Sequence, residues 1–380
     1  AGIASRMQPT KPPAANHAII ETIRRASERA AMGRRLANTP RYIAGMQRPD
    51  FLSRFLSHPA DRNALHWDGR WYTFGELVEM GERAAGGLRR AGVVPGDRVC
   101  IQLENGLDLV AAHLGCMALG AVRVPLNAHY RAAELAPILE DATPALAIPL
   151  TPQLFGGIPT VDRVAEGPRE GTWAGQNTDI TGLLFTSGTT GRPKGVPQPW
   201  RMWTNNLNAI EERWELATSD VLWLTLPLFH THGLVLGLHH ALLRGSAVIL
   251  SPRFDPIAPP DATHFYGVPT YYRRWVGLMQ QRPELFRRYR LLVSGSDGLP
   301  AELSDAVFSA TGHRVLERYG MTETVMIASN PYSGERRAGT VGKPLAGVDV
   351  RIAEGEVQVR GNAIFDGYWP RPDPSAFTED

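Results

Sequence analysis

The pattern of apolar and polar positions predicts a layered α/β fold over most of the chain. From about residue 51 onward, short apolar runs alternate with segments of helical periodicity. The apolar runs predicted as buried strands are 98–103, 121–125, 221–226, 247–250 and 291–294, and the clearest helix is 107–119. Strands separated by helices are typical of sheets whose faces are covered by helices. Residues 348–361 instead alternate apolar and polar side chains, which predicts a small antiparallel sheet.

The same pattern divides the chain into four parts. An N-terminal extension, 1–50, contains a basic amphipathic segment at 17–37 that is expected to form a helix docked on the body, with a membrane-surface role as the alternative. Proline- and glycine-rich residues near 159–175 mark a seam between a first α/β subdomain, 51–175, and a second, 176–345. A small β subdomain, 346–380, completes the chain.

Composition excludes several classes of partner. The 380 residues are 43% hydrophobic, enough for a large core, and 40 basic side chains face 38 acidic ones, so no excess charge calls for nucleic acid. No apolar run approaches the roughly 20 residues of a membrane span. Cys100 and Cys116 are too few for a disulfide framework and favour a reducing, cytoplasmic location.

The most informative segment is the loop 184–196. It carries three glycines, four hydroxyl side chains and the cations Arg192 and Lys194 after an apolar run. Backbone N–H groups, hydroxyls and cations gathered this closely suit the polyphosphate of a nucleotide, although a plain solvated loop would have a similar composition. Because Gly195 follows Lys194 where a P-loop needs Ser or Thr, a Walker-type NTPase is disfavoured.

Three more segments carry candidate chemistry. Residues 227–234 place His230 and His232 after a predicted strand, and no third metal ligand follows at zinc spacing. Residues 291–300 run from a strand through a glycine-rich turn, where Asp297 is expected to cap the next helix, with a contact to adenine as the alternative. Residues 317–324 combine an aromatic ring, hydroxyls and the carboxylate of Glu323, which suit a base, a phosphate and Mg²⁺.

Together these segments resemble the adenylate-forming superfamily of acyl-CoA synthetases, adenylation domains and luciferases. The loop at 186–195 is similar to the superfamily's Thr-Ser-Gly-Thr-Thr-Gly-x-Pro-Lys-Gly signature at every fixed position. Residues 319–323 resemble its Tyr-Gly-x-Thr-Glu segment, and the motifs occur in the superfamily's order over roughly residues 51–369. The resemblance implies an α/β fold, the large N-terminal body of such an enzyme, with ATP, Mg²⁺ and coenzyme A as its reactants.

The resemblance also implies a site, residue by residue. It gives catalytic roles to Thr186, Lys194, His230, Thr322 and Glu323, with Thr186 and Glu323 at the metal. It assigns nucleotide binding to Thr186, Ser187, Gly188, Thr189, Thr190, Gly191, Lys194, Ser296, Asp297, Gly298, Arg318, Tyr319, Gly320, Met321 and Thr322. It assigns the acid substrate to His230, Gly267, Arg274, Ser294 and Gly295.

The implied reaction is the activation of a carboxylic acid to an acyl-adenylate and then to a CoA thioester. Among the subfamilies, malonyl-CoA synthetase-like ligases look most similar, and Arg274 stands where a second carboxylate would be held. A fatty, aromatic or biosynthetic monocarboxylic acid is the alternative substrate. A non-catalytic adenylate-binding module is the alternative function, and a homo-oligomer is left open.

The superfamily continues beyond the point at which this sequence stops. Its members carry a Thr-Gly-Asp segment and a small C-terminal lobe with a catalytic lysine, and neither occurs in these residues. We therefore expect the isolated 380-residue chain to bind ATP or an acyl-adenylate but to turn over poorly.

Overall fold

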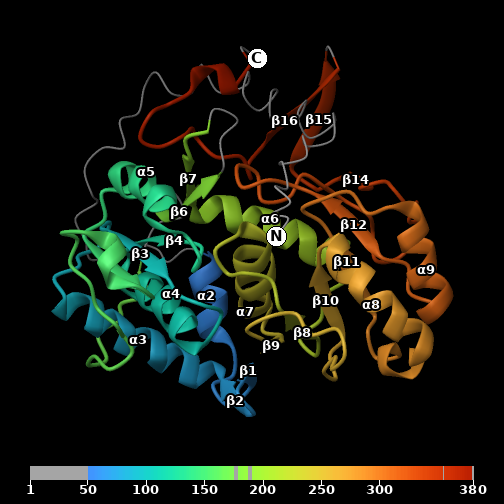
Figure 1. Ribbon diagram of the computed structural model, residues 1–380, viewed down its shortest axis with the longest axis horizontal. Helices are drawn as coiled ribbons and strands as arrows, with labels where there is room; N and C mark the ends of the chain where they lie inside the picture. The colour runs from blue at the N-terminus through green and yellow to red at the C-terminus, as the bar shows by residue number, and fades with distance from the viewer. Residues whose placement is uncertain (1–49, 175–178, 187–190, 354, 379–380) are drawn as a thin grey trace, which may run out of the picture.

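Two large sheets with helices on their faces, together with a small two-stranded sheet, make up the described part of the protein. The computed structural model describes residues 50–174, 179–186, 191–353 and 355–378. Figure 1 shows the smaller sheet on one side and the larger on the other, with α6 (Trp200–Arg213) and α7 (His240–Arg244) between them. The predicted α/β class is confirmed, because both sheets are mainly parallel and the connections between their strands are helical.

The larger sheet has nine strands in the order β14-β13-β12-β11-β10-β8-β9-β1-β2. Neighbours from β12 to β1 run parallel, and β2, β13 and β14 join them antiparallel at the two edges. Their bounds are β1 Asn63–Trp67, β2 Arg70–Thr73, β8 Val221–Leu224, β9 Ala247–Leu250, β10 His264–Gly267, β11 Leu291–Ser294, β12 Leu316–Tyr319, β13 Ala328–Ser329 and β14 Lys343–Pro344.

The smaller sheet has five strands in the order β5-β3-β4-β6-β7. Only its last pair, β6 with β7, is antiparallel. The bounds are β3 Arg98–Gln102, β4 Val122–Pro125, β5 Leu146–Pro149, β6 Ile180–Thr186 and β7 Lys194–Pro199. The two sheets are not separated along the chain. Strands β1 and β2, near the start of the described residues, belong to the larger sheet, whereas the later strands β6 and β7 belong to the smaller one.

The helix predicted at 107–119 is confirmed as α4. The longest helix, α3, begins with a capping box in which Thr73 and Glu76 satisfy each other's backbone N–H groups. Helix α4 is apolar around most of its circumference, and its residues from Leu109 to Leu119 are all buried. The remaining bounds are α2 Asp50–Ser57, α3 Phe74–Arg90, α4 Leu107–Leu119, α5 Ala132–Ala142, α8 Pro269–Gln281 and α9 Ala301–Thr311, with short 3₁₀ turns at Pro152–Phe155, Pro283–Phe286 and Pro374–Ala376 and a π-helix, η2, at His232–His239.

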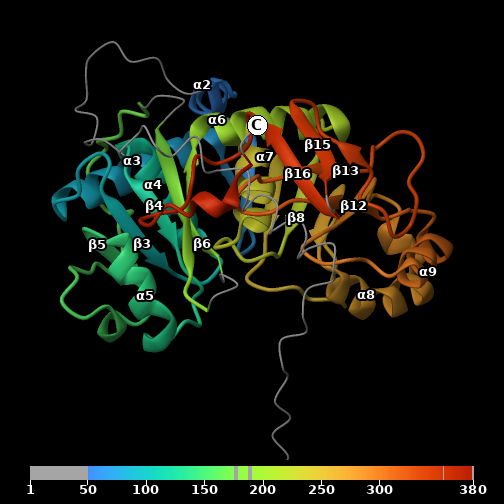
Figure 2. The same ribbon diagram turned by 90° about the horizontal axis from the view of Figure 1, so that it is seen from above.

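The predicted antiparallel sheet near the end of the chain is confirmed. Strands β15 (Val348–Ala353) and β16 (Glu356–Gly361) pair over their whole lengths. Figure 2 shows that the chain after β16 turns back and crosses toward β6 and β7. The last described segment therefore reaches from the hairpin to the smaller sheet.

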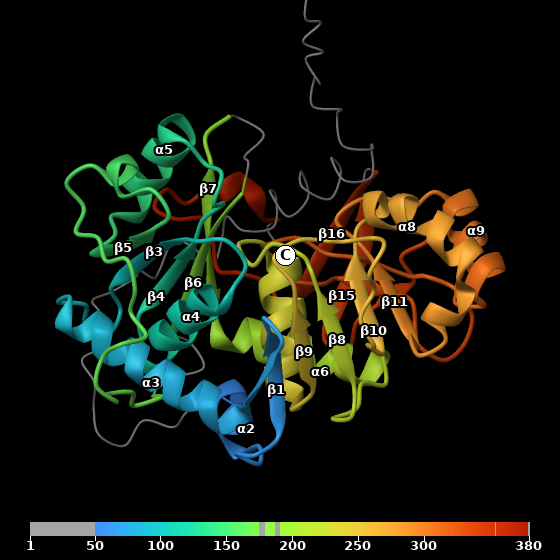
Figure 3. The same ribbon diagram turned by 60° about the horizontal axis from the view of Figure 1, so that its bottom comes forward.

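One large apolar core joins the two sheets. Trp203 on α6 and Trp214, the residue that follows α6, are fully buried in it, and α6 lies between the sheets in both Figure 1 and Figure 3. Burial of side chains this large contributes about 2–3 kcal/mol each. In the part of the chain that the structure describes, no helix has the length and hydropathy to cross a membrane. The helix predicted at 17–37 lies outside the described residues.

Candidate functional site at the carboxyl ends of the larger sheet

The topology of the larger sheet indicates where a ligand would bind. Strand β9 lies on one side of β8 and β10 lies on the other, so the strand order reverses between β8 and β10. Ligands of open α/β sheets bind in the crevice that such a switch leaves at the carboxyl ends of the strands. Three of the predicted segments, 227–234, 291–300 and 317–324, lie at the ends of β8, β11 and β12 there, and Gly267 is the last residue of β10.

A buried guanidinium without a full set of partners lies at this edge. Arg318, in β12, is 6% exposed, and its Nε and Nη2 make no hydrogen bond with any described residue. Burial lowers the pKa of Arg318 to about 10, so the side chain remains a cation at neutral pH. The guanidinium lies against the backbone of Gly295, where a Cβ would overlap it. An unpaired buried cation of this kind is suited to an anionic ligand.

His232, rather than His230, points into the interior beside this cation. The π-helix η2 begins at His232, and its imidazole Nδ1 lies 3.2 Å from the Ser296 hydroxyl. Burial, and then the charge of Arg318, hold the pKa of His232 well below its usual range, so the ring is neutral. The ring of His230 is exposed and packs on Phe229. π-Helical turns are frequent at functional sites.

A second cluster of charges gathers around the candidate phosphate loop. The Lys194 ammonium lies 2.7 Å from a carboxylate oxygen of Asp373 and 4.9 Å from the centre of the Tyr368 ring. The Tyr368 hydroxyl donates to Glu323 Oε1 at 2.8 Å. Burial raises the pKa of Glu323, and the hydrogen bond from Tyr368 and the charge of Lys194 partly offset that rise. A buried carboxylate can bind a divalent cation, and a lysine beside it can bind the phosphate that the cation also contacts.

The β6–β7 hairpin brings Thr186 opposite Lys194, as expected for a loop that closes on itself. Thr322 is half-buried, and its carbonyl accepts a hydrogen bond from Gln198 on β7, which ties the 319–323 segment to the hairpin. Gly191 has φ +86°, a conformation that favours glycine. Ser187, Gly188, Thr189 and Thr190 lie outside the described residues.

The remaining predicted residues lie on the same edge of the sheet. Gly267 and Ser294 are partners in the β10–β11 register, and Ser294 is paired with Glu317 of β12. The Ser294 hydroxyl is buried without a hydrogen-bond partner among the described residues. Others in this region are Gly298, Tyr319, Gly320 and Met321.

Two expectations for charged residues of the loops are wrong in detail. Asp297 does not cap the following helix: α9 begins at Ala301 with Pro300 as its N-cap, and no side chain caps it. The exposed Asp297 carboxylate instead accepts from the adjacent Gly298 N–H at 2.8 Å. Arg192 does not project toward a phosphate site, since its guanidinium is paired with Asp141 at 2.7 Å.

Arg274 is exposed on α8 and lies over the Phe254 ring at 5.4 Å. Phe254 also stacks on Tyr271, one turn earlier on the same helix. Arg274 therefore contacts an aromatic ring and is otherwise open to solvent, whereas Arg318 is buried at the ends of the strands.

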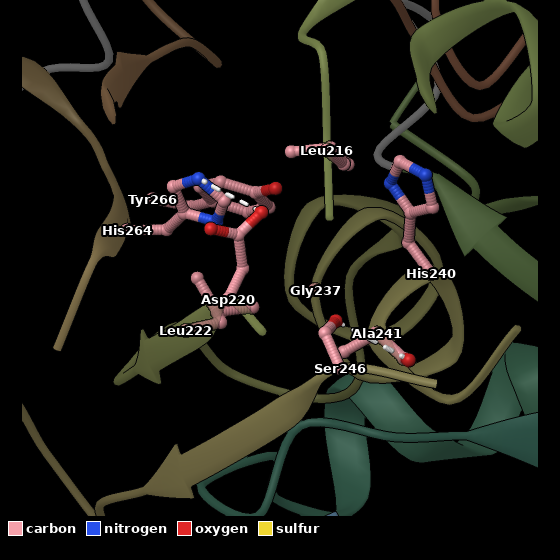
Figure 4. A pocket seen from close by; sticks show the side chains of 9 residues that line it. All are labelled: Leu216, Asp220, Leu222, Gly237, His240, Ala241, Ser246, His264 and Tyr266. Carbon is pink, nitrogen blue, oxygen red and sulfur yellow. Dashed lines mark hydrogen bonds and ion pairs between the residues drawn. The ribbon is translucent and has the colours of Figure 1, made fainter. Parts of the chain in front are cut away.

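A small internal pocket lies at the other end of the strands. Figure 4 shows its lining, in which His264 and Asp220 face each other and Tyr266 stands beside them. Asp220 is paired with Arg290 at 2.6 Å and with His264 at 3.6 Å. Since these residues begin or precede β8 and β10, the pocket is separate from the switch-point crevice. No group of three or more metal-ligating side chains occurs within the described ranges.

Comparison with known proteins agrees with this geometry. A family model described as AMP-binding enzyme matches residues 52–369. The chain belongs to the AMP-binding enzyme family. It is 32% identical to a malonate–CoA ligase of Arabidopsis thaliana, over 85% of this chain and 65% of that ligase. The chain thus spans just under two thirds of the length of this relative.

Solved structures of AMP-binding enzymes share the fold. ATP-bound MatB from Rhodopseudomonas palustris is 31% identical with a TM-score of 0.78, covering 85% of this chain and 72% of that one. A malonyl-CoA ligase with methylmalonyl-CoA and AMP bound is 38% identical with a TM-score of 0.77, covering 86% and 75%. The architecture at the switch point is therefore that of the family.

Sequence reasoning did not single out Tyr368, Asp373 or the inward position of His232. The sequence has Gly-Tyr-Trp at 367–369, followed by alternating prolines, but this pattern does not by itself predict a functional role. The signal that would have found Tyr368 and Asp373 is spatial, because they lie more than a hundred residues along the chain from Lys194.

Proposed function

We propose that this protein activates a carboxylic acid with ATP and that coenzyme A then accepts the acyl group as a thioester. The observation that carries the proposal is the presence of two charged sites on one segment, 316–323. Tyr368 contacts both Glu323 and Lys194 at one end of it. Near the other end lies the guanidinium of Arg318, whose Nε and Nη2 have no hydrogen-bond partner among the described residues. A phosphate site and a carboxylate site side by side are what acyl-adenylate formation requires.

In the first step, one oxygen of the substrate carboxylate attacks the α-phosphorus of ATP. A new P–O bond forms as the bond to the pyrophosphate oxygen breaks, and pyrophosphate leaves. Lys194 and the 186–195 loop neutralise the β- and γ-phosphate oxygens, and the Thr322 hydroxyl donates to the α-phosphate. Tyr319 offers its ring to adenine, and the backbone around Ser296 and Gly298 forms the floor of the site.

The residues at this site fit Mg²⁺. The Glu323 carboxylate is a hard oxygen donor, 4% exposed and oriented by Tyr368, and Thr186 adds a hydroxyl from the facing hairpin. The ion would neutralise phosphate charge. In the second step the thiolate of coenzyme A attacks the acyl carbonyl, and the bond between that carbon and the AMP oxygen breaks.

For the acid, we propose a short dicarboxylate of the malonate type. Arg318 supports this choice because Nε and Nη2 of its buried guanidinium have no partner among the described residues, and these two nitrogens can hold a carboxylate in a bidentate geometry. His232, Ser294 and Ser296 add hydroxyl and imidazole groups around it. Arg274, exposed on Phe254, is a secondary candidate whose side chain would have to turn.

A cytoplasmic location is part of the proposal. Cys100 and Cys116 are both unpaired and buried, and burial raises the pKa of Cys116 to about 12. Thiols kept protonated in this way are inert core residues, as suits a reducing compartment.

The test is carboxylate-dependent exchange of labelled pyrophosphate into ATP by the full-length gene product. Malonate is compared with acetate, benzoate and a long-chain acid. Exchange with malonate that is lost in Arg318→Met but retained in Arg274→Met supports the dicarboxylate reading and assigns it to Arg318. Exchange only with monocarboxylic acids would contradict that reading while leaving adenylation intact, and exchange with none would favour a non-catalytic nucleotide-binding module.

A further inference from the structure

The segment 362–378, here called the strap, fastens the candidate phosphate site to both sheets. Its Phe365 N–H donates to the Glu323 carbonyl at 3.0 Å, and Trp369 exchanges backbone hydrogen bonds with Gly195 at 2.8 and 3.2 Å. The Trp369 indole donates to the Asp141 carbonyl on α5 at 2.8 Å. Figure 2 shows the strap crossing from the β15–β16 hairpin to β6 and β7. The strap thus bonds to the backbone of Glu323 and to that of Gly195, the neighbour of Lys194.

Tyr368, on the strap, lies between these two charges. Its hydroxyl donates to Glu323 at 2.8 Å, and its ring carries the Lys194 ammonium at 4.9 Å from the ring centre. A hydrogen bond to a carboxylate fixes the direction in which the remaining lone pairs point. The face of a phenol ring attracts an ammonium without neutralising it, so this contact does not compete with an anionic ligand for the lysine.

Asp373, also on the strap, supplies a counter-charge for the same lysine. Its carboxylate lies 2.7 Å from the Lys194 ammonium, with about a quarter of each side chain exposed. Phosphate oxygens that approach Lys194 from the crevice must share the ammonium with this carboxylate or replace it. The ion pair therefore competes with an anionic ligand for one cation.

We infer that Tyr368 is a positioning residue for the nucleotide charge site and that Asp373 is the resting counter-ion of Lys194, which phosphate replaces. This inference rests on the proposed function, since it deepens the nucleotide-binding half of that proposal. Tyr368 acts through Glu323 and Lys194 and need not touch the nucleotide.

The first test measures ATP binding by isothermal titration calorimetry, once with magnesium present and once with a chelator. It separates the contact of the Tyr368 hydroxyl with Glu323 from the contact of the Tyr368 ring with Lys194. Tyr368→Phe removes only the hydroxyl, so binding of magnesium–ATP should weaken about tenfold while metal-free ATP binds nearly as before. Tyr368→Ala also removes the ring, and metal-free ATP should then weaken about two- to fivefold. Tyr289→Phe is the matched control, because its hydroxyl makes one hydrogen bond, to the Pro260 carbonyl at 3.0 Å.

Unchanged magnesium–ATP binding by Tyr368→Phe would overturn the positioning role. An equal loss of affinity for magnesium–ATP and for metal-free ATP would also overturn it, because a general loosening of the fold weakens the binding of both forms alike. If the unaltered chain binds neither form, the proposed function itself fails, which is a different result from an unaffected variant.

The second test addresses Asp373. In Asp373→Asn the lysine has no carboxylate to release, so metal-free ATP should bind about two- to fivefold more tightly. Asp366→Asn is the matched control on the same strap, since Asp366 is paired with Arg201 at 2.6 Å rather than with Lys194. Weaker binding by Asp373→Asn would overturn the counter-ion role and make Asp373 a ligand of the cation instead.

Discussion

Replacement of Arg318 by methionine should stabilise the unliganded protein while it removes the activity. The guanidinium is buried, and its Nε and Nη2 have no hydrogen-bond partner among the described residues. Burial lowers its pKa to about 10, and this lowering reflects the cost of burying the charge. Since one pKa unit corresponds to about 1.4 kcal/mol, the unpaired charge costs the folded state about 3 kcal/mol.

Methionine fills most of the arginine volume with an apolar chain and carries no charge. After an allowance for lost packing, the free energy of unfolding should rise by about 1–2 kcal/mol, measured by urea denaturation without ligands. Pyrophosphate exchange with malonate should fall to background in the same variant, because the second carboxylate loses its partner.

Arg336→Met is the matched control for this prediction. Arg336 is half-buried, but its guanidinium donates to the carbonyls of Pro331, Arg314 and Tyr332. Its loss should lower the free energy of unfolding by about 1–3 kcal/mol, because those carbonyls lose a partner. If Arg318→Met is destabilised as much as Arg336→Met, the guanidinium has partners in solution, and the argument for an empty anion site is refuted.

Three further outcomes are expected. Lys194→Ala should lower exchange by at least about a hundredfold with little change in unfolding, because its ion pair is partly exposed and worth about 1 kcal/mol or less; a tenfold loss or smaller would contradict its phosphate role. Gly295→Ala should displace the Arg318 side chain and raise the KM for malonate more than that for ATP, and equal changes would count against the contact. Burial lowers the pKa values of His240 and His264 to about 3, so below pH 6.5 the unfolded chain binds protons that the folded chain excludes. Urea unfolding at several pH values should show that the free energy of unfolding falls by about 2 kcal/mol per histidine between pH 7 and pH 5. A pH dependence of that free energy that is unchanged in His240→Leu would contradict this prediction.

Much of the site could be predicted because its chemistry lies in short contiguous segments. The strands around Val221, Ala247 and Leu291 are apolar runs of the expected length, and the loops between them carry the polar residues. In parallel sheets the carboxyl ends of neighbouring strands share an edge, so segments in chain order converge there. The hairpin that sets Thr186 opposite Lys194 follows from glycines between two apolar runs.

What could not be predicted depends on packing across the chain. Asp297 was expected to cap a helix, but Pro300 fixes the backbone at the start of α9, and the carboxylate turns to its own neighbour. His230 and His232 are two residues apart, and only the start of a π-helix at His232 decides which of them turns inward. The pairing of Asp373 with Lys194 depends on the path of the strap, which no local pattern encodes.

The central claim is that the carboxylate of an acid attacks the α-phosphorus of ATP at this site. The most direct measurement uses malonate labelled with heavy oxygen in its carboxylates, with ATP, magnesium and coenzyme A, and mass spectrometry of the nucleotide formed. The account predicts AMP that carries one labelled oxygen, unlabelled pyrophosphate, and no such AMP from Lys194→Ala. AMP without label, or ADP with labelled phosphate, would contradict an acyl-adenylate.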